Sequence, residues 1–327
     1  MKKLFSFLII TFISNFSNAD IKIVDFDQSM GKENKVLFKA MFATEEGAKL
    51  YNYYKKLWEH NSPDKMKAAK NPIIPKKFHQ LWVGPKPIPK EFLQRAKACQ
   101  KLHPDWEYKL WREKDLKEFD KKYPYLTSFH TEKNYAGRKD LYSLLILNEY
   151  GGIFSDIDIE CLRNLDELAH KYNFFGTTDI PRAKIKRPVF PIAFMGSKPD
   201  NIIINETLKI VEKKFKSCFS RKDHKYFYTA KFKIYNFFFK LFNKPPVVKC
   251  GSSNEFSVFS TYEALMKICK NYKCKSVVFP ATYLFPIYYD QYKHYSWWDK
   301  LKIYLGLEKR VHYFSKIRPE TFAYHRW

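Results

Sequence analysis

The chain has 327 residues, of which 45% are hydrophobic, and a single mixed α/β domain can reach this length. An aromatic content of 18% excludes general disorder, because disordered chains are poor in aromatic residues. The formal net charge of +25 predicts attraction to anions, which include nucleic acids, anionic membranes and phosphorylated small molecules. The sequence shows no helix-turn-helix, RNP or zinc-finger pattern, so we expect no nucleic-acid partner.

Residues 1–19 have the pattern of a secretory signal peptide. Lys2 and Lys3 precede an apolar run from Leu4 to Ile13, and Ala19 is a small residue at the expected cleavage position. The run is shorter than the roughly 20 residues that span a bilayer. We therefore predict a cleaved signal, with a short anchor or a buried strand as the alternatives. No other long uncharged apolar stretch occurs, and a multi-pass membrane protein is not expected.

Residues 20–71 are predicted to form an N-terminal helical lead-in, followed by a catalytic domain over residues 72–327. Apolar residues at helical spacing between positions 34 and 70 indicate one or two amphipathic helices. Residues 78–83 then have the pattern of a strand that Gly84 and Pro85 end. A helix over 91–102 and a second strand over 106–111 follow.

The next predicted helix covers residues 138–150, and Gly151 is well placed to end it. Residues 153–155 form a short predicted strand that leads into Asp156. Strands that alternate with helices indicate an α/β fold around a mostly parallel sheet.

Residues 224–244 interleave aromatic residues with lysines. This basic-aromatic segment predicts either a helix packed on the core or a helix at a membrane surface.

Six cysteines are present, and none forms a C-x-x-C pair, which argues against a zinc site. If the chain is exported, one or two disulfides are expected, and Cys250, Cys269 and Cys274 are the favoured source. The pairing does not follow from the sequence.

Asp156 and Asp158 form a D-x-D motif directly after the predicted strand. In α/β sheets, ligands bind at the carboxyl ends of strands. Two carboxylates at positions i and i+2 can share one hard divalent cation, and Mg²⁺ or Mn²⁺ typically bridges protein carboxylates and substrate phosphates. The pattern therefore predicts a site for a phosphorylated substrate, and a solvated acidic turn is the alternative.

Three segments carry a resemblance to known enzymes. Residues 74–84 read IPKKFHQLWVG, residues 104–111 read PDWEYKLW, and residues 136–158 begin AGRKDLY and end YGGIFSDID. These segments resemble glycosyltransferases with a DXD sugar-binding motif, which include glycosyltransferase family 32 and, more distantly, the glucosylating domains of large clostridial toxins. Later segments, including AYHRW at the end of the chain, extend the resemblance over most of residues 72–327.

The resemblance implies a Rossmann-like α/β fold of the GT-A type with added helices, and a retaining transfer reaction. By position, Trp82 would stack on the base of a nucleotide-sugar donor, and Asp140 would hydrogen-bond to ribose or sugar hydroxyls. Asp156 would contact sugar, ribose or metal, and Asp158 would bind Mn²⁺ or Mg²⁺ directly. A core tryptophan at 82 and a helix-start carboxylate at 140 are the structural alternatives.

The resemblance also assigns roles to the end of the chain. His325 would complete the metal or diphosphate site, and Trp327 would cap the donor. Family members usually carry Ser before the first aspartate and Arg three residues after it. Here Lys139 and Ser143 occupy those positions, and Arg138 is the nearest substitute.

These observations predict a glycosyltransferase that moves a sugar from a UDP-sugar, or less favourably a GDP-sugar, to a glycan, lipid or protein. The alternative is a catalytically weak GT-A-like module that docks on a membrane or glycan, with peripheral membrane contact through residues 224–244. Because nucleotide sugars are present in the secretory lumen, we expect the ER or Golgi lumen, or export into another cell.

Overall fold

A computed structural model describes residues 21–32, 38, 41–124, 135–179, 187–220, 253–284 and 317–325, except for the side chains of 215–220, 253–259 and 325. The predicted signal peptide, the basic-aromatic segment 224–244, Cys250 and Trp327 lie outside the described residues. Within those ranges, every helix is too short or too polar to cross a membrane.

The described residues form a six-stranded central sheet with two further strands beside it. The parallel pairs are β1 with β2, β1 with β3, and β5 with β7, whereas β6 runs antiparallel to both β3 and β5. The expected α/β architecture is therefore confirmed, with one reversed strand inside a largely parallel sheet. In sheet order the strands are β2 (Glu107–Arg112), β1 (Lys77–Trp82), β3 (Gly152–Ser155), β6 (Phe194–Ser197), β5 (Phe174–Thr177) and β7 (Ser276–Phe279).

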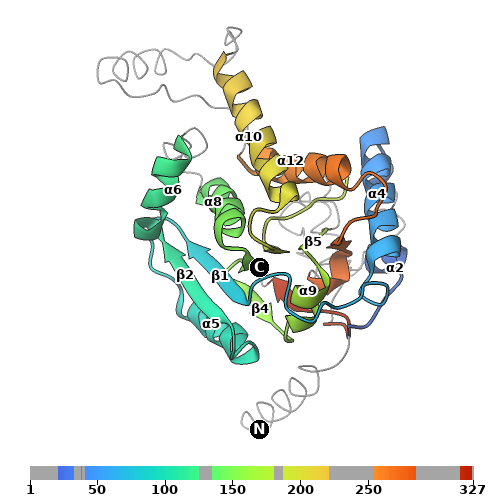
Figure 1. The fold of residues 1–327 in the computed structure, drawn as a ribbon, viewed down its shortest axis with the longest axis horizontal. Coiled ribbons are helices and arrows are strands. Elements are labelled where there is room, and N and C mark those ends of the chain that lie inside the picture. The colour runs from blue at the N-terminus through green and yellow to red at the C-terminus, as the bar shows by residue number, and fades with distance from the viewer. Residues whose placement is uncertain are drawn as a thin grey trace, which may run out of the picture.

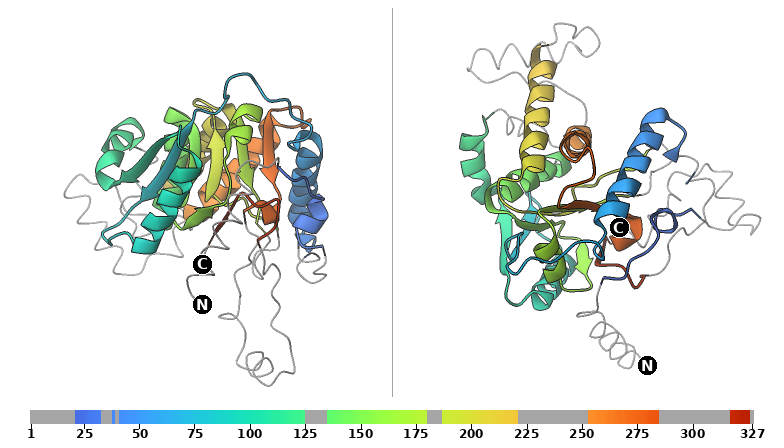
Figure 2. Two further views of the ribbon diagram at one scale, coloured as in Figure 1. Left: turned by 90° about the horizontal axis from the view of Figure 1, so that it is seen from below. Right: turned by 45° about the vertical axis from the view of Figure 1, so that its right-hand side comes forward.

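Helices cover both faces of the sheet (Figures 1 and 2). On one face lie α8 (Tyr135–Tyr150), α10 (Ile202–Ser220) and α12 (Ser253–Ile268), which pack against one another. On the other lie α5 (Lys90–Leu102) and α9 (Asp166–Lys171). The short elements η1 (Glu113–Leu116) and α6 (Lys117–Lys122) follow β2, and η4 (Ala281–Tyr283) follows β7.

The region before β1 contains α2 (Phe26–Ser29) and α4 (Glu45–Asn61). Thr44 caps α4 through its side-chain oxygen, which accepts a hydrogen bond from the Gly47 N–H at 3.0 Å. The buried face of α4 packs beside β7, and its Trp58 ring contacts the Phe279 ring edge-on. This helix shares one continuous core with the sheet.

A pair of glycines joins α8 to β3. Gly151 has a φ of +61° and Gly152 a φ of +96°, a region that side chains rarely adopt. A Cβ on Gly152 would also lie 2.5 Å from the Lys77 carbonyl oxygen. The two glycines therefore allow a buried helix to turn directly into the central strand, and they mark where that strand begins.

A second sheet of two strands pairs β4 (Ile159–Cys161) with β8 (Ala323–His325) in antiparallel register, with Ile159 opposite His325. The Tyr324 hydroxyl also donates to the Glu160 carboxylate at 2.9 Å. The backbone of the late segment therefore lies beside the strand that follows Asp158.

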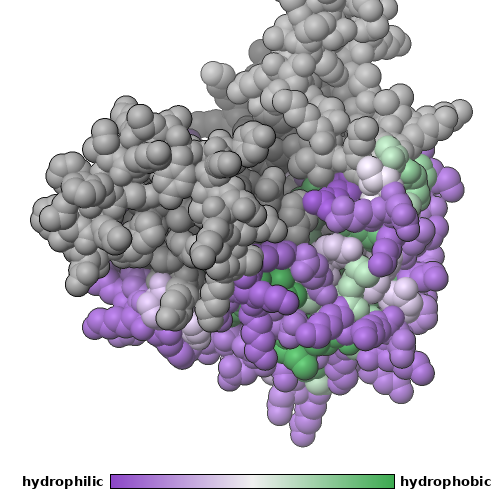
Figure 3. All heavy atoms as spheres, turned by 90° about the horizontal axis from the view of Figure 1, so that it is seen from above, coloured by the Kyte–Doolittle hydropathy of each residue, from purple (hydrophilic) through white to green (hydrophobic). Residues whose placement is uncertain are grey.

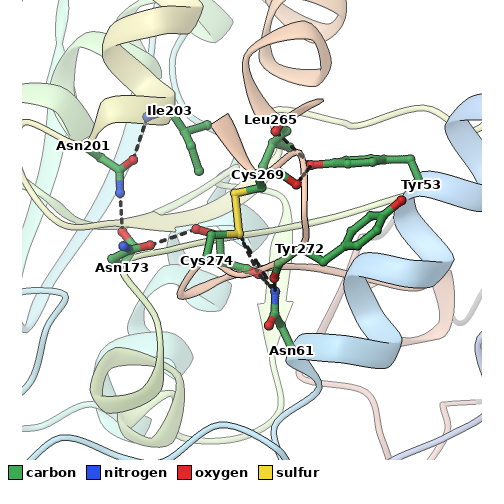
Figure 4. The surroundings of a disulfide bond; sticks show 10 residues. Tyr53, Asn61, Asn173, Asn201, Ile203, Leu265, Cys269, Tyr272 and Cys274 are labelled. Carbon is green, nitrogen blue, oxygen red and sulfur yellow. Dashed lines mark hydrogen bonds between the residues drawn. A yellow bond between two sulfur atoms is a disulfide. The ribbon is translucent and has the colours of Figure 1, made fainter. Parts of the chain in front are cut away.

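Two disulfides occur among the described residues. Cys99 of α5 is joined to Cys161 of β4, 62 positions later, a pairing outside the group favoured from the sequence. Cys269 is joined to Cys274, two members of that group (Figure 4). Beside this bond, the Asn61 side chain donates to the carbonyls of Tyr272 and Ser276 and so holds α4 against the start of β7.

One face of the molecule is shown in Figure 3. Where described residues are visible on it, hydrophilic side chains predominate and hydrophobic ones are scattered among them. This pattern is typical of a surface in contact with water.

Candidate functional site

The predicted site residues meet at one edge of the sheet. Strands β1 and β3 are parallel neighbours, so their carboxyl ends share an edge. Trp82 ends β1, and Asp156 directly follows β3. Helix α8 precedes β3 and runs back across the sheet, so its first turns also reach this edge. This is where α/β proteins bind their ligands.

A cavity of about 410 Å³ opens at this edge. Apolar and aromatic residues form most of its wall, and the charged lining residues are Lys86, Lys139, Asp156 and Asp158. Pockets of this size and mixture are typical of small-molecule sites. The lining residues are Leu81, Trp82, Val83, Gly84, Pro85, Lys86, Phe92, Tyr135, Ala136, Lys139, Asp156, Ile157 and Asp158.

The aromatic wall is formed by Trp82, Phe92 and Tyr135. The Trp82 ring is half-buried, and two contacts hold it in place. Its Nε1–H donates to the Lys86 carbonyl at 2.7 Å, and it packs edge-to-face with the Phe92 ring at a distance of 6.1 Å between the ring centroids. Gly84 has a φ of +100°, and a Cβ at this position would lie 3.1 Å from the Tyr135 ring. The glycine therefore lets the loop after β1 approach Tyr135, and a flat ligand can rest against fixed aromatic faces.

The polar end of the cavity centres on Lys139. Its Nζ lies 2.7 Å from an Asp140 carboxylate oxygen, and 2.8 Å and 3.0 Å from the two Asp156 carboxylate oxygens. It also donates to the Ile192 carbonyl at 3.2 Å. One ammonium group therefore links two predicted site aspartates to the segment that enters β6.

Burial changes the pKa values of this cluster. It raises the pKa of Asp140 to about 6, because the charged carboxylate loses water, and Lys139 limits that rise. Burial alone would lower the pKa of Lys139, but the charges of Asp140 and Asp156 outweigh it and raise that pKa. The lysine is therefore a permanent cation at physiological pH.

The backbone around the D-x-D motif is fixed from two sides. The Asp156 N–H donates to the Ala193 carbonyl at 2.7 Å, and the Arg95 guanidinium donates to the Asp158 carbonyl at 3.0 Å. Arg95 and Cys99 are both on α5, and the Cys99–Cys161 disulfide joins this helix to β4, the strand that follows Asp158. Helix α5 therefore holds the turn both through a covalent bond and through the Arg95 hydrogen bond. The turn that carries Asp156 and Asp158 is thereby fixed where both residues line the cavity.

The structure brings four of the six predicted site residues together. Trp82, Asp156 and Asp158 line the cavity, and Asp140 is joined to them through Lys139. The backbone of His325 lies opposite Ile159, next to this cluster, but its side chain is outside the described set.

Ser143 stands where the family pattern has arginine, and Arg138 is the nearest substitute. Arg138 does not line the cavity; it forms an ion pair with Glu113, whose other carboxylate oxygen accepts from the Gly84 N–H. Ser143 is buried, and its hydroxyl donates to the Asp140 carbonyl at 2.8 Å. Neither residue supplies a cation to the cavity, so Lys139 is the residue whose role the sequence reasoning missed.

The carboxylates of the cavity suit a divalent metal that is also bound by substrate phosphates. Within the ranges that the structure describes, no three His, Cys, Asp or Glu side chains gather as a metal cage. Mg²⁺ and similar ions are usually held by one or two carboxylates together with substrate phosphates. Asp158 would hold the ion at the cavity together with the substrate phosphates. Asp156 would contribute only if its ion pair with Lys139 leaves an oxygen available.

The part of the chain that forms this edge of the sheet is similar to a known protein family. Residues 89–175 match the family described as glycosyltransferase sugar-binding region containing DXD motif. The predicted resemblance is confirmed. The matched region includes α5, α8, β3 and the D-x-D motif, so it covers most of the polar end of the cavity.

Several curated proteins are similar to this chain. Inositol phosphoceramide mannosyltransferase 3 of Schizosaccharomyces pombe is 40% identical over 99 residues, which are 30% of this chain and 28% of the relative. Mannosyl phosphorylinositol ceramide synthase CSH1 of Saccharomyces cerevisiae is 25% identical over 279 residues, which are 78% of this chain and 70% of the relative. The match to the first relative thus spans less than a third of that protein.

Among solved structures, the catalytic domain of alpha-toxin from Clostridium novyi aligns over 80% of this chain and 86% of its own length. The sequence identity is 10% and the TM-score is 0.39.

Proposed function

We propose that the protein is a glycosyltransferase with a GT-A architecture that moves a hexosyl group from a nucleotide-sugar donor to an acceptor and retains the anomeric configuration. The observation that carries the proposal is the meeting of Asp156, Asp158 and the Trp82 ring at one cavity, on the carboxyl edge of β1 and β3. A nucleotide sugar has a flat base, hydroxyl groups and a diphosphate. The cavity offers an aromatic wall for the first and charged groups for the others.

Each part of the donor has a partner in this arrangement. The Trp82 ring would stack on the base, and Asp140 and Asp156 would accept hydrogen bonds from ribose or sugar hydroxyls. Asp158 would hold Mn²⁺ or Mg²⁺, which neutralises charge on the departing nucleoside diphosphate. Transfer would pass through an oxocarbenium-like transition state, so the residues contribute mainly by orientation and charge stabilisation.

The acceptor proposed here is a lipid with an anionic headgroup, and the sugar is mannose. Support comes from the names of two similar proteins, an inositol phosphoceramide mannosyltransferase and a mannosyl phosphorylinositol ceramide synthase. A formal net charge of +25 favours approach to an anionic membrane surface. Free glycans and proteins are the other acceptors to be tested.

We further propose that the protein works in the lumen of the secretory pathway or after export. Two disulfides among the described residues fit an oxidising compartment, as does the signal pattern of residues 1–19. N-terminal sequencing of the mature protein should give Asp20 as the first residue. A mature cytosolic protein that begins at Met1 would refute this location.

The test of function is a calorimetric titration with UDP- and GDP-hexoses, GDP-mannose included, in the presence and absence of Mn²⁺. We expect metal-dependent binding of one donor and its transfer to an inositol-phosphate lipid. Asp158→Ala should reduce the transfer rate by more than ~100-fold, the scale seen when a preorganised electrostatic partner is lost.

Asp105→Asn is the matched control, because Asp105 is an exposed, ion-paired aspartate outside the cavity. Near-normal transfer by Asp158→Ala would refute the metal assignment. If the wild-type protein binds no donor at all, the alternative of a binding module with a degenerate site is favoured instead.

A further inference from the structure

The ammonium group of Lys139 has no spare hydrogen-bond donor. A lysine side chain carries three N–H donors. In this structure the acceptors within hydrogen-bond distance are the Asp140 carboxylate, the Asp156 carboxylate and the Ile192 carbonyl, at 2.7, 2.8 and 3.2 Å. Although Lys139 lines the cavity, its donors are therefore already used by the protein. It would have to break one of these bonds to hold a substrate phosphate.

The three acceptors come from three different elements. Asp140 is on α8, Asp156 follows β3, and Ile192 precedes β6. Adjacent residues on a helix do not normally face one another, so the Lys139 stem must fold back for its ammonium to reach the Asp140 carboxylate. This geometry places one cation between two carboxylates at the junction of the helix and the sheet.

The position of this cation determines where a metal can bind. Asp140 and Asp156 lie close enough to share a single ammonium, and without it the same pair would be an oxygen-rich site for a hard divalent cation. With Lys139 in place, a metal ion at this pair would meet a fixed positive charge. The acceptors that surround the Lys139 ammonium belong to Asp140, Asp156 and Ile192, and Asp158 lines the same cavity.

We propose that Lys139 is a positioning residue that occupies the Asp140–Asp156 pair as an internal cation, reserves both carboxylates for donor hydroxyls, and directs the divalent metal to Asp158. The inference rests on the proposed function, because it assigns separate tasks to the aspartates of that site.

The test measures Mn²⁺ binding by electron paramagnetic resonance, with UDP or GDP present and with neither. Asp158→Asn should remove Mn²⁺ binding, whereas Asp156→Asn should weaken it by no more than ~10-fold, the scale of one lost unit charge a few ångströms from the ion. Lys139→Met should increase the affinity at least ~10-fold, since a unit charge a few ångströms away is removed from a partly buried site. Sugar transfer by this variant should fall, so affinity and activity change in opposite directions.

Two further variants separate positioning from a simple structural role. Lys139→Arg keeps the charge and should restore most of the activity and the wild-type Mn²⁺ affinity. In the double variant Lys139→Met/Asp156→Asn, the gain in affinity should vanish, because the vacated pair has lost one carboxylate.

Lys76→Met is the matched control. Lys76 also bridges two aspartates, Asp105 and Asp166, but it lies outside the cavity lining. Its loss should therefore leave both Mn²⁺ affinity and sugar transfer unchanged.

Three results would overturn the inference. They are a Lys139→Met variant whose Mn²⁺ affinity is unchanged or lower, an Asp156→Asn variant that loses Mn²⁺ binding, and a wild-type protein that binds no Mn²⁺ even with nucleotide. The second result applies even if Lys139→Met does not fold. Failure of the proposed function gives a different result from failure of this inference. In that case the wild-type protein would consume no nucleotide sugar, but the Lys139, Asp156 and Asp158 variants would still show the expected order of Mn²⁺ affinities.

Discussion

His79 should make the protein lose stability in acid. This residue lies on β1, three positions before Trp82, and is 2% exposed. Its Nε2–H donates to the Gly151 carbonyl at 2.9 Å, and its Nδ1 accepts the indole N–H of Trp111 at 3.2 Å. A second proton on the ring would have to be placed on Nδ1, where it would face another donor. The folded protein therefore requires the neutral ring.

The magnitude follows from the change in pKa on folding. Burial lowers the pKa of His79 from 6.5 to about 4, and the Gly151 carbonyl only partly opposes this. Between these two pH values the unfolded chain binds a proton that the folded protein does not, so stability falls as the pH falls. Each pH unit corresponds to about 1.4 kcal/mol, and the loss between pH 7 and pH 4 is therefore about 3 kcal/mol.

Urea denaturation at a series of pH values measures this effect. His79→Gln keeps a side-chain N–H donor but cannot titrate, so its stability should decline about 3 kcal/mol less than that of the wild type over the same range. His60→Gln removes an exposed histidine at the end of α4 and is the control. Parallel pH profiles for the wild type and His79→Gln would refute the reasoning.

Three other substitutions test the site and its frame. Trp82→Ala should weaken nucleotide binding by about tenfold or more, the scale of base–aromatic stacking, whereas Trp82→Phe should retain most of it; equal calorimetric affinities for the wild type and Trp82→Ala would exclude stacking. Replacing both Cys99 and Cys161 with Ala should lower the free energy of unfolding by about 4 kcal/mol, because their bond closes a loop of 62 positions, and a urea midpoint equal to that of the oxidised wild type would contradict this. Gly152→Ala should destabilise the protein by more than ~2 kcal/mol, because its φ is +96° and the new Cβ would meet the Lys77 carbonyl oxygen; an unchanged melting temperature would show that the turn can relax.

The positions of the early strands could be predicted from the sequence to within one residue. Residues 78–83 and 106–111 were expected, and the structure gives Lys77–Trp82 and Glu107–Arg112. Short apolar runs beside glycine and proline determine such elements locally. The insertion of antiparallel β6 between β3 and β5 was not predictable, because the apolar pattern of a strand does not specify its neighbours.

The candidate site could be predicted only where a local motif specifies it. Asp156 and Asp158 follow a recognisable strand, and both line the cavity. Lys139 was noticed only as a departure from the family pattern, because its role depends on the distant Ile192 carbonyl. The Cys99–Cys161 bond was missed for a similar reason, since it joins residues that become neighbours only when α5 packs on β4.

The pairing of β4 with β8 has a consequence for how the protein is made. Tyr324 and Glu160, which hydrogen-bond across this pair, are 164 positions apart, and β8 is the last described element to leave the ribosome. Until then β4 remains an unpaired edge, which is open to pairing with other chains. Contacts of such long sequence separation also form slowly. Substitutions that weaken β8 should therefore reduce the yield of soluble protein during synthesis, even where the finished protein is stable.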